Sequence, residues 1–104
     1  MRIRVADRAT HCLLKITKSD RERIKRKIKE YENKPDLLEA NLTIEQAGIY
    51  NDFFKQSGAK LGHFRVGDWR VIGIIEKDVF HSVGIVPRGE LEKELAKVTR
   101  QFPF

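Results

Sequence analysis

The sequence predicts an α+β fold, in which an N-terminal strand and a helical hairpin pack on an antiparallel β-sheet meander that precedes a C-terminal helix. Residues 60–86 form three strand-like stretches separated by the turn pairs Gly67-Asp68 and Lys77-Asp78. Residues 24–31 instead carry apolar side chains at helical spacing. A chain of 104 residues, 40% of them hydrophobic, has room for one modest core, so we expect a single domain spanning residues 1–104.

The first third of the chain reads as a strand followed by two helices. Residues 2–6 alternate in the manner of a half-buried strand, and a short helix is expected after Asp7, a possible N-cap. A second helix is predicted to start at Ser19, with Glu22 completing a capping box. Its apolar stripe is Ile24, Ile28 and Tyr31. Pro35 is expected to close this helical hairpin.

Residues 36–60 carry the weakest pattern. The letters "TIEQ" at 43–46 fit another capping box, and apolar residues between Ile44 and Phe54 are spaced to line a third helix. Ser57 and Gly58 would end it.

The last part of the chain gives the clearest elements. Strands are expected over 60–66, 69–76 and 79–86, and the apolar run 71–75 is typical of a strand buried on both faces. After the loop "PRGE", residues 90–100 read as a helix with Leu91 and Leu95 on one face. We expect the meander to form one side of the fold and the helices the other.

Charge is the most informative bulk property. Lysine and arginine number 21 against 15 acidic residues, which gives a formal net charge of +6. Such a balance favours a polyanionic partner, either nucleic acid or an acidic protein, although a solvated basic surface has the same composition.

Several classes of protein are not expected. No apolar run approaches the length of about 20 residues that spans a bilayer, and the first residues lack the apolar core of a signal peptide. Cys12 is the single cysteine, which we interpret as a small core residue and not a nucleophile, and no Cys/His cluster has the spacing of a zinc site. The sequence therefore predicts a cytoplasmic protein with no membrane partner, no metal and no cofactor.

The stretch "LGHFRVGDWRVIGIIEKDVFHSVGIVPRGEL", residues 61–91, resembles the RelE/ParE toxin superfamily of type II toxin–antitoxin systems. Its members have an arginine-rich hairpin leading into a strand, and a further basic loop before the last helix. The resemblance implies a RelE/ParE-like fold and a cognate antitoxin protein as partner. RelE-like members are metal-independent mRNA endoribonucleases (mRNA interferases) that inhibit translation by cutting mRNA, usually on the ribosome. ParE-like members inhibit DNA gyrase and cleave nothing, so the resemblance leaves the target open.

Candidate catalytic residues lie on and around this hairpin. Period two places His63 and Arg65 on one strand face, which we expect to point away from the core. The resemblance matches Arg70 to the family arginine assigned to phosphate binding, and Arg88 to one of the arginines of the loop before the last helix. Arginine offers phosphate a bidentate fork. Histidine carries protons near neutral pH, so His63 and His81 are candidate acids or bases, although a lone histidine beside a strand is more often structural or solvated than catalytic.

Further RNA contacts are expected from other basic side chains. Lys60 begins the hairpin strand, and the helix "RERIKRKIK" should expose Lys25 and Lys29 together with Arg21, Arg26 and Lys27. These could contact ribosomal RNA or an acidic antitoxin segment, or form a solvated face.

One position departs from the family pattern. Many RNA-cleaving members carry a tyrosine at the place that Glu92 occupies here. A carboxylate cannot stack on a base and repels phosphate, which leaves open an altered arrangement of acid and base, a gyrase inhibitor or a weakened toxin. A non-catalytic RNA-binding domain of the same fold is a further alternative.

Overall fold

The computed structural model describes residues 1–45 and 56–101. Its strands and helices follow the chain in an alternating order, with a short 3-10 turn before the last helix. The elements are β1 (Arg2–Val5), α1 (Asp7–Leu14), α2 (Lys18–Asn33), α3 (Pro35–Asn41), β2 (Thr43–Glu45), β3 (Lys60–Val66), β4 (Trp69–Glu76), β5 (Val79–Pro87), η2 (Arg88–Glu90) and α5 (Leu91–Gln101). Among the described residues, no helix combines the length and apolar character needed to cross a membrane.

The strands form one mixed sheet in the order β1-β5-β4-β3-β2. β3, β4 and β5 are the predicted antiparallel meander, and β2 pairs antiparallel with β3. β1 instead pairs parallel with β5, so the N-terminal strand closes one edge of the sheet. This arrangement confirms the predicted α+β class with its N-terminal strand, helical hairpin, meander and C-terminal helix.

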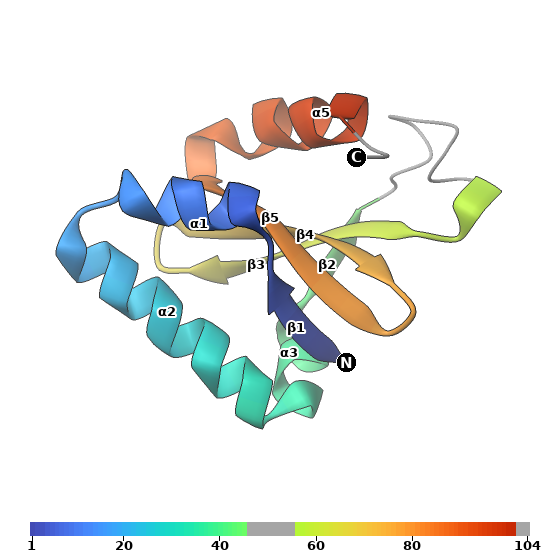
Figure 1. The fold of residues 1–104 in the computed structure, drawn as a ribbon, viewed down its shortest axis with the longest axis horizontal. Helices are drawn as coiled ribbons and strands as arrows, with labels where there is room; N and C mark the ends of the chain where they lie inside the picture. Colours follow the sequence, from blue (N-terminus) through green and yellow to red (C-terminus); the bar gives the residue numbers. More distant parts are fainter. Residues whose placement is uncertain (46–55, 102–104) are drawn as a thin grey trace.

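Helices cover both faces of the sheet, and the expectation that they would all lie on one side was wrong. Figure 1 shows α2 and α3 on the opposite side of the strands from α5. Ala9 and Leu13 of α1 pack in the same core as the buried residues of α2. The reason lies in β4, where residues 71–75 are all buried and therefore present apolar side chains to both sides. A strand that is apolar on both faces needs a cover on both faces.

The larger core lies on the α2 side of the sheet. Ile24, Ile28 and Tyr31 of α2 are buried there, as the sequence pattern predicts. The ring of Tyr31 meets that of Phe64 edge to face, with centroids 5.0 Å apart, and Phe64 in turn lies 5.5 Å from Phe80. Such pairs stabilise a core beyond the area they bury.

The smaller core lies under α5. Leu95 and Val98 of α5 pack there with Ile72, Ile74 and Leu61 of the sheet. Leu61 is fully buried, so the face shared by Leu61, His63 and Arg65 is in part a core face and does not simply point to solvent.

Both predicted tight turns are present. Gly67 has φ +59° while Asp68 stays in the ordinary region, which is the pattern of a type II′ hairpin turn. Lys77 and Asp78 both have positive φ, at 52° and 61°, which is the pattern of a type I′ turn.

The predicted helix N-caps were wrong, by one residue for Asp7 and by two for Ser19. α1 begins at Asp7 after Ala6, and α2 begins at Lys18 after Thr17, in both cases without a side-chain cap. Asp7 and Asp20 instead lie in the first turns, where a carboxylate is stabilised by the helix dipole.

The segment after α2 differs most from expectation. α2 does end before Pro35, but Pro35 then opens α3, where its missing N–H costs nothing. Thr43 is not a helix cap, since residues 43–45 form β2. The rest of the predicted third helix falls on residues 46–55, outside the described part of the chain.

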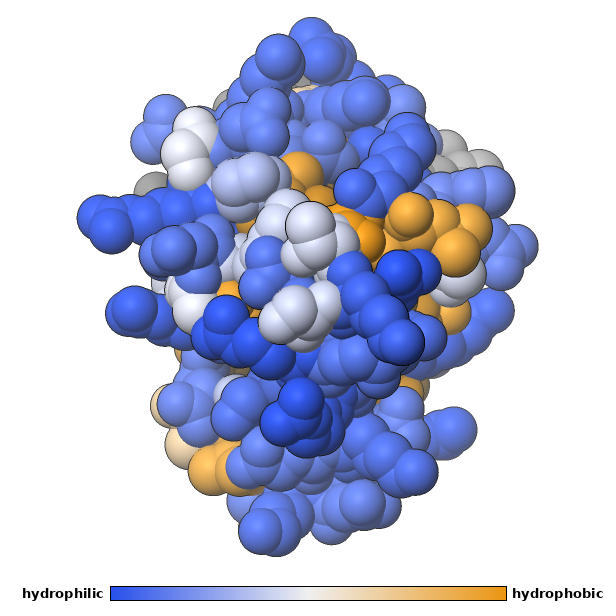
Figure 2. Space-filling model, turned by 90° about the vertical axis from the view of Figure 1, so that its left-hand side faces the viewer, coloured by the Kyte–Doolittle hydropathy of each residue, from blue (hydrophilic) through white to orange (hydrophobic). Residues whose placement is uncertain are grey.

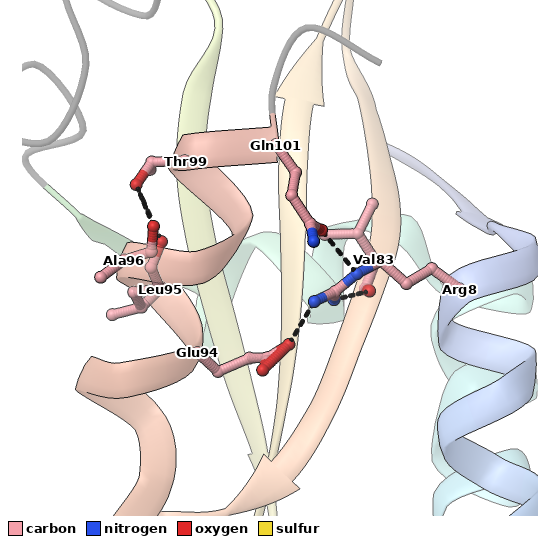
Figure 3. Close-up of polar contacts among 7 residues, drawn as sticks. All are labelled: Arg8, Val83, Glu94, Leu95, Ala96, Thr99 and Gln101. Atoms are coloured by element: carbon pink, nitrogen blue, oxygen red, sulfur yellow. Dashed lines mark hydrogen bonds and ion pairs between the residues drawn. The ribbon is translucent and has the colours of Figure 1, made fainter.

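α5 is tied to the N-terminal half through Arg8. Its guanidinium donates to the carbonyl oxygen of Val83 at 2.6 Å, pairs with Glu94 at 2.8 Å and donates to Gln101 at 3.1 Å. Figure 3 shows Arg8 reaching these three partners across β5. A Cβ at Gly84 would lie 3.2 Å from both Arg8 and Glu94, so the glycine leaves room for the ion pair.

Candidate functional site

The β3–β4 hairpin brings two of the predicted arginines side by side. Arg65 and Arg70 are direct cross-strand partners. Along the chain they are separated by two residues on each side of the turn centre, namely Val66, Gly67, Asp68 and Trp69. Directly opposed residues of an antiparallel pair share one face of the sheet, here the face that carries α5. Like charges in this position repel, so the sequence places two cations together at an energetic cost.

Arg70 is the more enclosed of the two. Only 8% of it is exposed, and its Nη1 atom donates to the carbonyl oxygens of Gly67 and Trp69, each at 3.1 Å. Within the described residues it has no carboxylate ion-pair partner. The turn carbonyls therefore hold the guanidinium in place without neutralising it.

The pKa of Arg70 is lowered, first by desolvation and then by the charges of Arg65 and Arg88. Asp68 opposes this shift. Arginine stays protonated throughout the biological pH range, so the lowered pKa describes a cation held in an unfavourable place. An anion bound there would relieve the repulsion.

Arg88 joins this group through its backbone. Its N–H donates to the carbonyl oxygen of Asp68 at 2.8 Å, which fixes η2 against the β3–β4 turn. The loop expected over "PRGE" is in fact η2. We call Arg65, Arg70 and Arg88 the arginine cluster.

His63 lies on the same face as the cluster, two residues before Arg65 and opposite Ile72. Its Nδ1 atom lies 2.7 Å from Oε1 of Glu45 in β2, and both side chains are largely buried. The two atoms are close but not aligned as a hydrogen bond, since Nδ1 has no hydrogen-bond partner among the described residues. The Glu45 carboxylate thus lies directly beside the imidazole ring and restricts its orientation.

His81 shares the face but lies apart from the cluster. It is opposite Ile74 and beside Arg4 of β1, four residues along β4 from Arg70. At about 3.3 Å per strand residue, that separation is roughly 13 Å. The structure therefore does not bring His81 together with the three arginines.

The three predicted lysines also lie away from the cluster. Lys60 is opposite Ile75, whose side chain belongs to the α2-side core, so Lys60 lies on the other sheet face. Lys25 and Lys29 are exposed on α2. At about 100° per residue, they occupy the flank of α2 opposite to that of Arg23, Arg26 and Lys27.

Glu92 is exposed in the first turn of α5, where its charge suits the helix dipole. Cys12 is partly buried and packs against the α2-side core, in agreement with its interpretation as a core residue. No group of three or more histidine, cysteine or acidic side chains placed to hold a metal is found in residues 1–45 and 56–101.

Sequence reasoning missed two sets of residues near the site. Glu45 was read as part of a helix, and its strand position beside β3 emerges only from the sheet. Arg23 was not singled out, yet it lies with Arg26 and Lys27 along a groove that also reaches Arg65. Arg23 also lies against Gly67 of the β3–β4 turn, a contact that no sequence pattern indicates.

Two solved structures resemble this chain. A chain of the archaeal RelE–RelB complex from Pyrococcus horikoshii OT3 matches with a TM-score of 0.58 and 21% identity, covering 85% of this chain and 94% of that one. A chain of the RelB–RelE antitoxin–toxin complex from Methanococcus jannaschii matches with a TM-score of 0.55 and 20% identity, over 88% and 96%. Comparisons with protein-family models and with curated proteins find no match. The chain has the RelE-like toxin fold.

Proposed function

We propose that this protein is the toxin of a type II toxin–antitoxin system and that it inhibits translation by cleaving mRNA on the ribosome. The observation that carries the proposal is the arginine cluster. Arg70 is nearly buried and has no carboxylate partner in the described residues, Arg65 lies directly opposite it, and the charge of Arg88 also acts on it. An uncompensated group of guanidinium forks suits a phosphate that gains negative charge as it reacts.

The chemistry requires charge stabilisation and two proton transfers. Attack of the 2′-hydroxyl on the adjacent phosphate forms a pentacoordinate phosphorane, and the bond to the 5′-oxygen then breaks. Arg70, with Arg65 and Arg88, offsets the phosphorane charge. His63, oriented by Glu45, is the candidate that takes the 2′-hydroxyl proton or returns one to the leaving 5′-oxygen.

His81 is the less favoured candidate for the general acid or base. Its position opposite Ile74 separates it from the arginines, so a nucleotide bound at the cluster would have to extend along the sheet to reach it. Lys60, Lys25 and Lys29 would serve only as peripheral RNA contacts.

The proposed partner is an antitoxin protein encoded with the toxin. Both solved neighbours are RelE–RelB complexes, and a chain with the same fold and a net charge of +6 suits an acidic partner segment. Co-expression of the neighbouring gene product should restore growth and give a stable complex on purification.

A gyrase inhibitor is the second candidate, and Glu92 favours it. A carboxylate replaces the tyrosine that many RNA-cleaving members carry, so base stacking at this position is lost. This candidate predicts arrest of DNA synthesis with intact transcripts. A non-catalytic RNA-binding domain would leave growth unaffected.

Primer extension on translated transcripts tests the proposal. After induction of the wild-type chain we expect cuts inside codons. Arg70→Lys keeps the charge but loses the fork, and it should reduce cutting by about 10²-fold, the effect of removing one preorganised donor. Arg100→Lys, on the exposed side of α5, is the matched control and should cut like the wild type. Growth arrest with uncut transcripts would contradict the proposal.

A further inference from the structure

A second basic site lies next to the arginine cluster, in a groove between α2 and the β3–β4 hairpin. Its volume is about 440 Å³, and α2 lines one wall with Arg23, Arg26, Lys27 and Glu30. The hairpin lines the other wall, where Arg65 and Gly67 lie. We call this feature the α2–hairpin groove. Figure 1 shows α2 and the β3–β4 turn at the left-hand end of the molecule, and Figure 2 shows that this end is predominantly hydrophilic.

The charges of the groove are only partly balanced. Lys27 pairs with Glu30 at 3.1 Å, and Arg23 pairs loosely with Asp20 at 3.6 Å. In the described part of the chain, neither Arg26 nor Arg65 has an ion-pair partner. The groove therefore keeps at least two free guanidinium groups on facing walls.

The shape of the turn lets the two walls approach each other. A Cβ at Gly67 would lie only 2.6 Å from Nη2 of Arg23, so the guanidinium rests directly over the turn backbone. The positive φ of Gly67 also favours glycine there. The turn that positions Arg70 thus also positions Arg23.

Arg65 connects the groove with the arginine cluster. β2 pairs with β3 only as far as His63, so Arg65 lies where the edge of β3 is open. It is exposed, lines the groove and acts electrostatically on Arg70. A chain of phosphates crossing this edge would pass from the groove to Arg70 by way of Arg65.

We propose that the α2–hairpin groove binds the sugar–phosphate backbone of the RNA strand whose scissile phosphate lies at the arginine cluster. This inference rests on the proposed function and adds a second phosphate site to it. An RNA strand fits better than an acidic protein segment, because Val66 is the one apolar residue lining the groove among the described residues and it is itself buried. A peptide would find little apolar surface there, whereas backbone phosphates need only the cations.

The salt dependence of RNA binding tests this site without requiring cleavage. The probe is a short single-stranded 2′-O-methyl oligoribonucleotide, which lacks the attacking hydroxyl. We call the double variant Arg23→Gln with Arg26→Gln the groove pair. It should make the negative slope of log K against log salt shallower by about 1.4, since each lost phosphate contact on a single strand contributes about 0.7. Glu30→Gln removes the groove carboxylate and frees Lys27, so it should tighten binding severalfold.

Two further double variants complete the test. Lys97→Gln with Arg100→Gln removes the same charge from exposed positions late in α5 and should leave the slope near the wild-type value. Lys25→Gln with Lys29→Gln removes the same charge from the opposite flank of α2, so it should change the salt slope less than the groove pair does. An equal or larger effect there would overturn the groove as the backbone site. An unchanged salt slope in the groove pair would also overturn the groove as the backbone site. The same holds if the groove pair loses binding of an acidic peptide but keeps binding of the RNA probe.

The two proposals fail separately. If transcripts are cut in an Arg70-dependent manner but the groove pair binds the probe like the wild type, the groove proposal is wrong and the proposed function stands. If the groove pair loses probe binding but no transcript is cut, the binding site stands and the cleavage proposal is wrong.

Discussion

Gly73 allows the ring of Phe80 to cross the central strand of the sheet. A Cβ at position 73 would lie 2.3 Å from the ring, closer than any real contact allows. Phe80 is fully buried and packs against Phe64, so the ring has no free space into which to move.

We therefore expect Gly73→Ala to destabilise the protein by about 1–3 kcal/mol, the usual cost of overpacking a core. Gly89→Ala is the matched control, because no atom lies within 4 Å of its built Cβ, and it should change stability by less than about 0.5 kcal/mol. Denaturant unfolding measures both. Equal midpoints for the two variants would contradict this account of Phe80.

Tyr31 gives the core a pH dependence. Its pKa is raised above 10.0, chiefly by desolvation, while Lys27 opposes the shift. The folded state therefore holds the phenol proton more tightly than the unfolded state does. The resulting stability is complete below pH 10 and is lost as the pH rises through the folded pKa.

Tyr31→Phe keeps the ring that packs on Phe64 but cannot ionise. We expect the variant to lose less stability than the wild type between neutral pH and pH above 10, as followed by urea unfolding at each pH. Parallel stability curves for the two proteins would show that Tyr31 does not contribute to alkaline unfolding.

Among the site residues, those fixed by local pattern were predictable. The alternation of β3 places His63 and Arg65 on one face, and the turn at Gly67 brings Arg70 opposite Arg65. Register between distant strands has no local signal, so the separation of His81 from the cluster could not be foreseen. The contact of Glu45 with His63 depends in the same way on how β2 meets β3.

At the scale of elements, α5 depends on Arg8 for its connection to the rest of the chain. The guanidinium is 24% exposed and Glu94 13% exposed, so the pair is partly shielded from water. Removing Arg8 would leave the Glu94 carboxylate and the Val83 carbonyl oxygen without this donor.

We expect Arg8→Met to destabilise the protein by about 1–3 kcal/mol, the cost of leaving such groups unsatisfied. Amide hydrogens of α5 should exchange faster in this variant, while those of α2 change less. Arg100→Met, an exposed position on the same helix, serves as the control. Uniform acceleration over both helices would mean that Arg8 stabilises the whole fold and not α5 in particular.

The strands were predictable because turn residues bound each of them, at Gly67-Asp68 and Lys77-Asp78. The helix starts were less predictable. Ala6 and Thr17 precede helices without making a side-chain cap, and Pro35 begins a helix where the end of one was expected. The position of α5 on the second sheet face follows from tertiary packing of residues 71–75, although their apolar character already implied two buried faces.

At the scale of the whole molecule, the cations of the proposed site gather at one end. The β3–β4 turn lies there, with α2 on one side of the sheet and the start of the C-terminal helix on the other (Figure 1). The sheet supplies rigid positions for Arg65 and Arg70, while α2 and η2 add Arg23, Arg26 and Arg88. This gathering, more than the net charge of +6, is what favours an RNA target.

The order in which cellular processes stop tests the central claim most directly. When the wild-type chain is induced alone, incorporation of labelled methionine into protein and of labelled thymidine into DNA are followed over the same minutes. We predict that protein synthesis falls first, and that Arg70→Lys delays or removes the fall. DNA synthesis falling first, with protein synthesis initially unchanged, would contradict an mRNA-cleaving toxin and favour a gyrase inhibitor.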